Sequence, residues 1–228
     1  MSKNGKGYMG EQIGKLGPAV GKIWKGKMIY SAYQKFVHNP HTRSQRLIRA
    51  RFAKLTEMES VFLPILRIGL GVVADKRAVT EGNKFVDLNW NAVTATSPEE
   101  VEVNYGSLVV GKGILPNANF HEPDFETERQ VTVAFDSDTV ALYAGENDLV
   151  YLFAYQPDLR QSRMGKPVRR SAESITMTLP SAWSGMRVHL YSVAVGKSTN
   201  TDLETTEVWE KNIGLVSDSV YVGSGDAA

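Results

Sequence analysis

Apolar residues recur at helical spacing after Asn39, and this pattern predicts a basic amphipathic helix that begins at about Arg43. Thr42 and Gln45 form a capping-box pattern at its start, which supplies partners for unbonded backbone N–H groups of the first turn. One face is apolar and is expected to lie in a core: Ile48, Phe52, Leu55 and Phe62, flanked by Leu47 and Met58. The other face carries Arg43, Arg46, Arg49 and Glu57. Arg51 falls at the edge of the apolar stripe, where we expect it to reach water or pair with a carboxylate.

The helical pattern is predicted to break at Pro64, because proline lacks the backbone N–H that a helix interior needs. A second short helix is expected from Pro64 to about Leu70, where Gly69 and Gly71 would end it. A third short helix is expected within residues 80–94.

The region before the basic helix is expected to contain a β-hairpin. Residues 18–37 alternate in part and are rich in β-branched and aromatic residues, with a turn predicted near Gly26. Residues 1–17 contain glycines spaced three and four apart, and each would weaken a helix by about 1 kcal/mol relative to alanine. We therefore expect an extended or looped arm there.

From Glu99 onward, apolar and polar residues alternate, which is typical of strands with one buried face. The predicted strands cover residues 102–110, 129–135, 149–155, 174–179, 187–195 and 216–222. Strands of this number and spacing favour an antiparallel β-sandwich of the immunoglobulin or fibronectin type III kind, with Trp183 on its core. The sequence therefore predicts an α+β chain in three segments: a Gly/Lys-rich basic arm with a hairpin (1–37), a helical segment (38–98) and a β-sandwich domain (99–228).

Charge is distributed unevenly along the chain, although the net charge is only +1. Residues 1–57 hold twelve lysines and arginines against two acidic residues, and the remainder holds 14 basic against 23 acidic residues. Opposite charges in the two parts suit head-to-tail association of identical subunits. They equally suit a basic arm that binds nucleic acid, or an arm that folds back on its own acidic body.

Composition and motifs argue against an enzyme. The 228 residues include no cysteine, which excludes disulfides and thiolate chemistry. No apolar run approaches the roughly 20 residues of a membrane span, and the N-terminus does not resemble a secretory signal peptide. His121, Glu122 and Asp124 are only a weak candidate metal set, because they lie close together in an irregular loop. No catalytic or phosphate-binding motif is complete, so we expect no bound cofactor or metal.

The residues expected to contact a partner combine positive charge with aromatic rings. Lysine and arginine side chains suit an acidic protein surface or a phosphate backbone, and neighbouring aromatic rings suit base stacking. The alternative for the hairpin aromatics is that they place one face in a core or an interface. Trp209 lies in a polar loop, where it marks a contact or tucks against the sheet edge. The candidates are Lys15, Lys22, Trp24, Lys25, Lys27, Tyr30, Arg43, Arg46, Arg49 and Trp209.

Motifs at both ends of the chain resemble a known family. The N-terminal signature is Gly14-Lys-Leu-Gly17, Val20-Gly-Lys-Ile-Trp24-Lys-Gly26 and Asn39-Pro40-x-Thr42-x-x-Gln45-x-x-x-Arg49-x-x-Phe52. The C-terminal signature is Leu179-Pro-Ser-Ala-Trp183-Ser-Gly185, Val188-His-Leu-Tyr191 and Val216-Ser-Asp-Ser-Val220-Tyr-Val-Gly223. Together they are similar to an uncharacterised protein family common in Bacteroidota and in phages that infect them.

The resemblance implies no activity, since none is assigned to that family. Its occurrence in phages implies a virion structural component, of the tail or the head surface, with other virion proteins and copies of itself as partners. A nucleic-acid-binding protein is the alternative. A carbohydrate-binding or adhesive module is the third, in which exposed Trp183, Trp209 or Tyr221 would make the contacts.

Overall fold

The structure, a computed structural model of the chain, describes residues 13–24, 26–36, 39–76, 79–137, 144–196 and 215–228. Contacts divide the chain into two compact units, Met1–Thr42 and Arg43–Ala228, which are called unit 1 and unit 2 below. The helices and the later strands, which the sequence placed in successive segments, share unit 2.

Unit 1 contains a small antiparallel sheet, called the N-terminal sheet below. It consists of β1 (Gly14–Leu16), β2 (Ala19–Trp24) and β3 (Lys27–Ala32), in the order β1-β2-β3. Trp24 pairs with Lys27, so the predicted hairpin is confirmed with its turn at residues 25–26, and Gly26 has a φ of +75°. β1 lies within the segment expected to be an extended or looped arm and adds a third strand to the hairpin.

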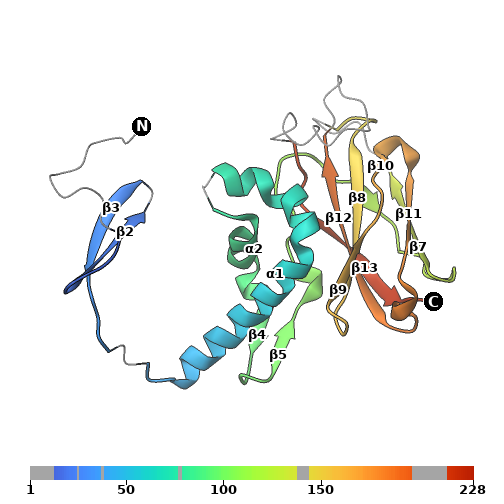
Figure 1. Ribbon diagram of the computed structural model, residues 1–228. Coiled ribbons are helices and arrows are strands. Elements are labelled where there is room, and N and C mark those ends of the chain that lie inside the picture. The colour runs from blue at the N-terminus through green and yellow to red at the C-terminus, as the bar shows by residue number, and fades with distance from the viewer. Residues whose placement is uncertain (1–12, 25, 37–38, 77–78, 138–143, 197–214) are drawn as a thin grey trace. The chain divides into compact units, whose positions relative to one another are not determined.

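Helix α1 (Arg43–Lys76) begins where the capping pattern predicts. The predicted break at Pro64 is wrong, because the helix continues through it. Phe62, Ile65 and Leu66 are 0% exposed on either side of the proline, and this packing outweighs an interior-proline cost of about 3 kcal/mol. Figure 1 shows α1 changing direction in its C-terminal half, as is common for a helix with an internal proline.

Gly69 does not end the helix either. Because it has no side chain, the backbone of α1 can lie close to the backbone of residues 110–112. The Lys112 backbone N–H donates to the Gly69 carbonyl over 2.9 Å. A side chain at Gly69 would overlap the Val110 carbonyl oxygen and Gly111. The residue therefore lets the loop before β6 lie directly on α1.

Helix α2 (Glu81–Asn89) confirms the third helix expected within residues 80–94. The Thr80 hydroxyl caps it by accepting from the Asn83 backbone N–H over 3.2 Å. A 3₁₀ turn, η1 (Trp90–Ala92), leads into β4 (Val93–Ala95), which pairs with β5 (Val101–Val103). The predicted strand over 102–110 is therefore short, and another 3₁₀ turn, η2 (Tyr105–Ser107), follows it.

Two antiparallel sheets make up the rest of unit 2 (Figure 1). The larger has the order β10-β8-β12-β13, with β9 also paired to β8, and the smaller has the order β11-β7-β6. Their strands are β6 (Asn119–Phe120), β7 (Gln130–Asp136), β8 (Leu149–Gln156), β9 (Gln161–Met164), β10 (Val168–Arg169), β11 (Ser174–Thr178), β12 (Arg187–Val195) and β13 (Val220–Asp226). Four of the predicted strands are confirmed within a residue or two of each end, and the last begins at Val220 rather than Val216.

The larger sheet is buried on both faces. Val150 and Leu152 of β8 share one apolar cluster with β7 and β11, and Trp183 is fully buried there, as expected. Phe153 and Tyr155 point to the other face and share a second cluster with α1 and α2. Unit 2 is thus a mixed α+β unit with mostly antiparallel sheets, in which the helices share a core with the strands.

Among the helices that the structure describes, none has the length and apolarity that would let it cross a bilayer.

Candidate interaction surface

The pairing register of the N-terminal sheet gathers four of the predicted contact residues on one face. Residues that pair across antiparallel strands share a face, and successive residues alternate between faces. Trp24 pairs with Lys27, and Lys22 pairs with Ile29. Lys15 of β1 pairs with Val20, which lies two residues before Lys22. We call the resulting surface the lysine face; it comprises Lys15, Val20, Lys22, Trp24, Lys27, Ile29 and Ser31.

The three lysines of this face form a diagonal row, one on each strand. Each step moves one strand across and two residues along, from Lys15 to Lys22 and from Lys22 to Lys27. With about 3.3 Å per residue and about 4.8 Å between strands, the Cα atoms of neighbouring lysines are about 8 Å apart. The row is therefore a regularly spaced line of positive charge.

The opposite face of the N-terminal sheet carries no charge. We call it the apolar face; it comprises Gly14, Leu16, Ala19, Gly21, Ile23, Met28, Tyr30 and Ala32. Tyr30, predicted to contact a partner together with the lysines, lies on this face, so a single flat partner cannot meet both.

Unit 1 has almost no core of its own in the part that the structure describes. Gly21 is the one buried residue there. The large apolar side chains stay accessible, with Trp24 57% exposed, Tyr30 53% and Phe36 91%. Lys15 places its ammonium 4.1 Å from the centre of the Tyr33 ring, a cation–π contact that fixes β1 near the end of β3. The sheet is held by its backbone ladder, and its apolar side chains stay available to a partner.

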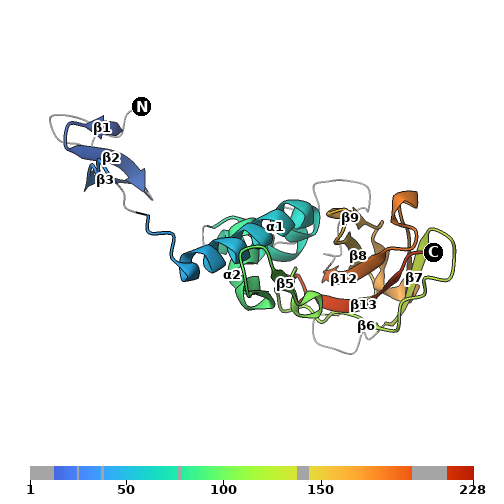
Figure 2. The same cartoon turned by 90° about the horizontal axis from the view of Figure 1, so that it is seen from below.

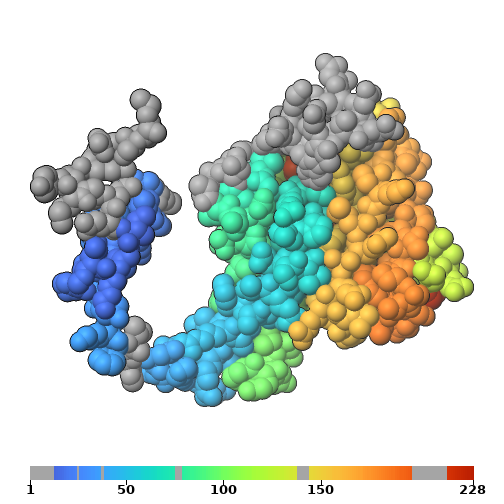
Figure 3. Space-filling model, viewed as in Figure 1, coloured from blue at the N-terminus to red at the C-terminus, as the bar shows by residue number. Residues whose placement is uncertain are grey.

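The start of α1 offers a second basic and apolar surface. Arg43, Arg46 and Arg49 are exposed, as predicted. Ile48 and Phe52, predicted to lie in the core, are each 53% exposed, and that prediction is wrong. The buried stripe begins only at Leu55, because the described part of unit 2 does not extend far enough to cover the first turns. Figure 3 shows these turns at the edge of unit 2, beside the β4–β5 hairpin.

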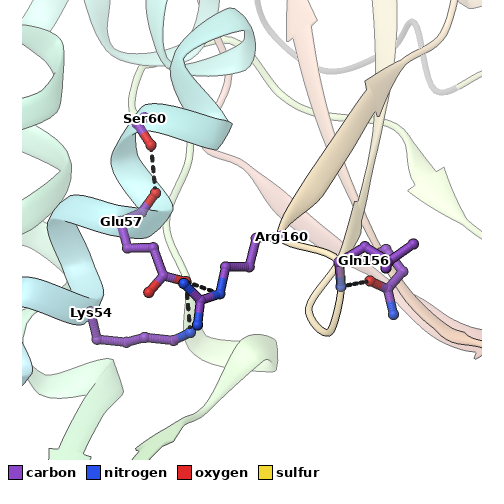
Figure 4. Close-up of polar contacts among 6 residues, drawn as sticks. Lys54, Glu57, Ser60, Gln156 and Arg160 are labelled. Carbon is purple, nitrogen blue, oxygen red and sulfur yellow. Dashed lines mark hydrogen bonds and ion pairs between the residues drawn. The ribbon is translucent and has the colours of Figure 1, made fainter.

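Not every basic residue of the helix is available to a partner. Arg51 donates to the Trp90 carbonyl, and its guanidinium lies 4.4 Å from the centre of the Trp90 ring, where water or a carboxylate was expected. Glu57 forms ion pairs with Lys54 and with Arg160; its Oε1 lies 3.1 Å from the Lys54 Nζ and 3.1 Å from the Arg160 Nε (Figure 4). The Arg160 pair ties the β8–β9 turn to α1, and Lys54 is already paired with Glu57.

Some of the predicted site residues are not part of either basic surface. Lys25 and Trp209 lie outside the described residues. Trp183 is 0% exposed, and its indole N–H donates to the Gln161 side chain over 3.0 Å, so it cannot contact a carbohydrate. The weak metal set does not form, since His121 lies 3.1 Å from Asp136 and the described residues contain no group of three metal-binding side chains.

The largest pKa shifts fall in an aromatic cluster where α1 and β5 pack on the larger sheet. Burial raises the pKa values of Tyr155 and Tyr191 well above the usual tyrosine range. Burial, with a smaller contribution from Arg187, lowers the pKa of His189 to about 4. The His189 ring stacks on Tyr105 with 4.1 Å between centroids, and its Nδ1 lies 2.9 Å from the Tyr221 hydroxyl. The cluster stabilises the junction of helices and sheet.

The low pKa of His189 predicts that unit 2 loses stability in mild acid. The unfolded chain, with a histidine pKa of about 6.5, binds a proton more readily than the folded chain as pH falls from about 6.5 to about 4. After allowance for solvent screening, we expect the unfolding free energy to be about 1 kcal/mol lower at about pH 5 than at about pH 7. Urea unfolding at the two pH values measures the loss. His189→Gln keeps a hydrogen-bonding side chain and should remove that component; an unchanged pH dependence in this variant would assign it to other groups.

A known family model matches most of the chain. The model described as "Family of unknown function (DUF6266)" matches residues 10–202, which span the N-terminal sheet, both helices and the strands through β12. No curated protein matches the chain. The match agrees with the expectation of a family without an assigned activity.

Proposed function

We propose that this chain, which belongs to the DUF6266 family, is a non-enzymatic structural protein of a phage virion, in the tail or on the head surface. It docks on neighbouring subunits through the N-terminal sheet and the basic start of α1. The observation that carries the proposal is a folded sheet whose apolar side chains are largely exposed within the described residues of unit 1.

Energetics support docking of the sheet. Ordering each backbone residue costs about 1–2 kcal/mol, and a small sheet recovers this cost mainly by burying apolar side chains. The N-terminal sheet has strands of three, six and six residues, and the buried position that the structure describes in it is a glycine. A partner surface supplies the missing burial.

Charge indicates what kind of surface receives the sheet. The described residues of unit 1 include four lysines and no acidic residue, and three exposed arginines follow at the start of α1. An acidic protein surface attracts both elements and orients them during encounter. Virion proteins assemble through such contacts between many copies, which fits the occurrence in phages of the family that the terminal motifs resemble.

The rest of unit 2 serves as the body of the subunit in this proposal. The two sheets act as an antiparallel sandwich of the immunoglobulin type, supported by the apolar cluster that β7 and β11 share with β8 and β12. The helix layer on the outer face of the larger sheet carries the arm. In this proposal unit 2 is the folded body of the subunit, and the N-terminal sheet buries its apolar side chains on a neighbouring subunit.

The test is the mass of the protein in solution, with and without the arm. Light scattering at about 50 mM and about 500 mM salt should show an oligomer that weakens as salt screens the contact. A variant that lacks residues 1–38 keeps the cap of α1 and should have the mass of one subunit at both salt concentrations. An untruncated chain that is monomeric at low salt, or a truncated chain that still assembles, would contradict the proposal. The virion assignment is tested separately: the genes that flank this one should encode phage proteins, and mass spectrometry should find the chain in purified particles of that phage.

Nucleic-acid binding is the second candidate function, and one observation favours it. Three lysines and Trp24 share the lysine face, a combination that suits phosphate contact with base stacking. In that case the purified protein would carry nucleic acid, and the logarithm of its affinity would fall linearly with the logarithm of salt concentration. A protein free of nucleic acid that still assembles would exclude this candidate.

A further inference from the structure

A row of carboxylates lies on unit 2 in the connection between β6 and β7. Glu122, Asp124, Glu126 and Glu128 alternate with other residues, and all four are exposed. Pro123 and Phe125 lie between them and contact Gly223 and Gly225 of β13. The segment continues the path of β6 beside β7, with the Asp124 backbone paired to Thr132. Packing and backbone bonds thus hold the acidic side chains on the outer surface.

The acidic row and the attachment point of unit 1 lie at opposite ends of unit 2. Figures 1 and 2 show α1 beginning at one end, while the β6–β7 connection and the C-terminus lie at the other. Unit 1 therefore joins unit 2 at the end away from the acidic row. The acidic row of a neighbouring copy is the surface that we consider as its partner.

The two rows are opposite in charge. Glu122 and Asp124 lie on the stretch that runs beside β7, where alternate Cα atoms are about 7 Å apart, close to the spacing of about 8 Å between neighbouring lysines. The chain then turns: the Asp124 Oδ1 accepts from the Glu126 backbone N–H, and the Gln130 backbone N–H donates to the Thr127 carbonyl. Opposite charges on the two surfaces attract and orient them during encounter.

A shallow depression lies beside the acidic row. It has a volume of about 340 Å³ and is lined by polar and charged residues, Glu128, Arg129, Gln130 and Thr178. Trp24 lies at the end of the lysine row on the same face and is 57% exposed. Aromatic side chains are enriched in protein interfaces.

From these observations we propose that the lysine face of one copy docks on residues 121–130 of a second copy. Lys15, Lys22 and Lys27 pair with the acidic row, and Trp24 enters the depression beside Glu128. The contact joins two different surfaces of the chain, so it is head-to-tail and generates a ring or a filament. This inference rests on the proposed function and names the surface that receives the lysine face; the opposite, apolar face is not part of this contact.

The test reverses the charge of each row in the full-length protein. The lysine variant is K15E/K22E/K27E, and the acidic variant is E122K/E126K/E128K. Asp124 is left unchanged because its Oδ1 accepts from the Glu126 backbone N–H. We expect each variant alone to associate about 100-fold more weakly than the unsubstituted protein, as measured by sedimentation equilibrium. An equal mixture should assemble again, because each variant then supplies the surface that complements the other, and this rescue shows that both are folded.

A matched control and three further outcomes separate the possibilities. E99K/E102K/E146K makes the same charge change at exposed positions elsewhere and should assemble like the unsubstituted protein. If the lysine variant is monomeric but the acidic variant assembles normally, the sheet docks elsewhere and only this inference fails. If both variants are monomeric and the mixture does not assemble, the two rows do not face each other. If the lysine variant assembles normally, the lysine face is not the docking surface and this inference fails; the proposed function fails only if the variant that lacks residues 1–38 also assembles.

Discussion

Phe62→Ala is expected to lower the unfolding free energy of unit 2 by about 3–5 kcal/mol. Phe62 is 0% exposed and lies at the centre of the helix–sheet junction. Its ring centroid is 4.8 Å from that of Tyr155 and 5.0 Å from that of Phe153, and Phe85 and Tyr191 complete its surroundings. Alanine removes these ring contacts and leaves a cavity that the surrounding strands cannot fill. Urea unfolding followed by tryptophan fluorescence measures the loss as a lower midpoint.

Phe52→Ala provides the matched control on the same helix. Phe52 is 53% exposed, so its truncation should change stability by no more than about 0.5 kcal/mol. The pair tests whether the buried stripe of α1 begins at Leu55. A large loss at Phe52 would show that the first turns are covered in solution, and a small loss at Phe62 would contradict the shared core of helices and strands.

Local signals predicted most of the elements. The hairpin turn depends on Gly26, whose positive φ favours glycine, and the capping pattern before Arg43 marks the start of α1. Strands β7, β8, β11 and β12 follow strict alternation or continuous apolar runs, which depend on burial of the strands themselves. Such features arise within a few residues and can be read from a sequence.

The errors in the fold prediction come from tertiary contacts. Pro64 breaks a helix by local rules, but buried neighbours on both sides hold α1 together. Ile48 and Phe52 have the same helical phase as Leu55, and only the extent of unit 2 decides that they are exposed. The sequence shows the helical period of the apolar stripe on α1. It does not show how much of that stripe the rest of unit 2 covers.

The candidate surface was predictable in composition but not in geometry. The lysines and Trp24 are evident in the sequence, whereas their common face depends on the register of β2 with β3 and on the pairing of β1, which lies in a glycine-rich stretch with no strand pattern. Of the acidic row, Glu122 and Asp124 entered the prediction only as part of a weak metal set with His121. The alternation of acidic residues at 122–128 was a signal for a charged surface segment, and the prediction overlooked it.

Arg170→Met is expected to destabilise unit 2 by about 3–5 kcal/mol, although the new side chain is apolar and similar in length. Arg170 is 0% exposed, and its Nη2 donates to the Pro116 carbonyl over 2.6 Å. Its Nε lies 3.5 Å from the Oδ2 of Asp148, a carboxylate that is 4% exposed. Methionine removes the cation that compensates this buried negative charge. Urea unfolding at neutral pH measures the loss.

The double variant Asp148→Asn/Arg170→Met separates the charge effect from the packing effect. Asparagine keeps an oxygen that accepts from the Gly145 backbone N–H, which donates to Asp148 over 2.8 Å, but it carries no charge. We therefore expect the double variant to recover most of the stability, with a remaining loss of about 1–2 kcal/mol. Recovery would show that the single variant fails because a carboxylate stays buried without its arginine. An equal loss in both variants would show instead that Arg170 stabilises the fold through its bond to Pro116 and its packing, because removal of the charge on Asp148 would then change nothing.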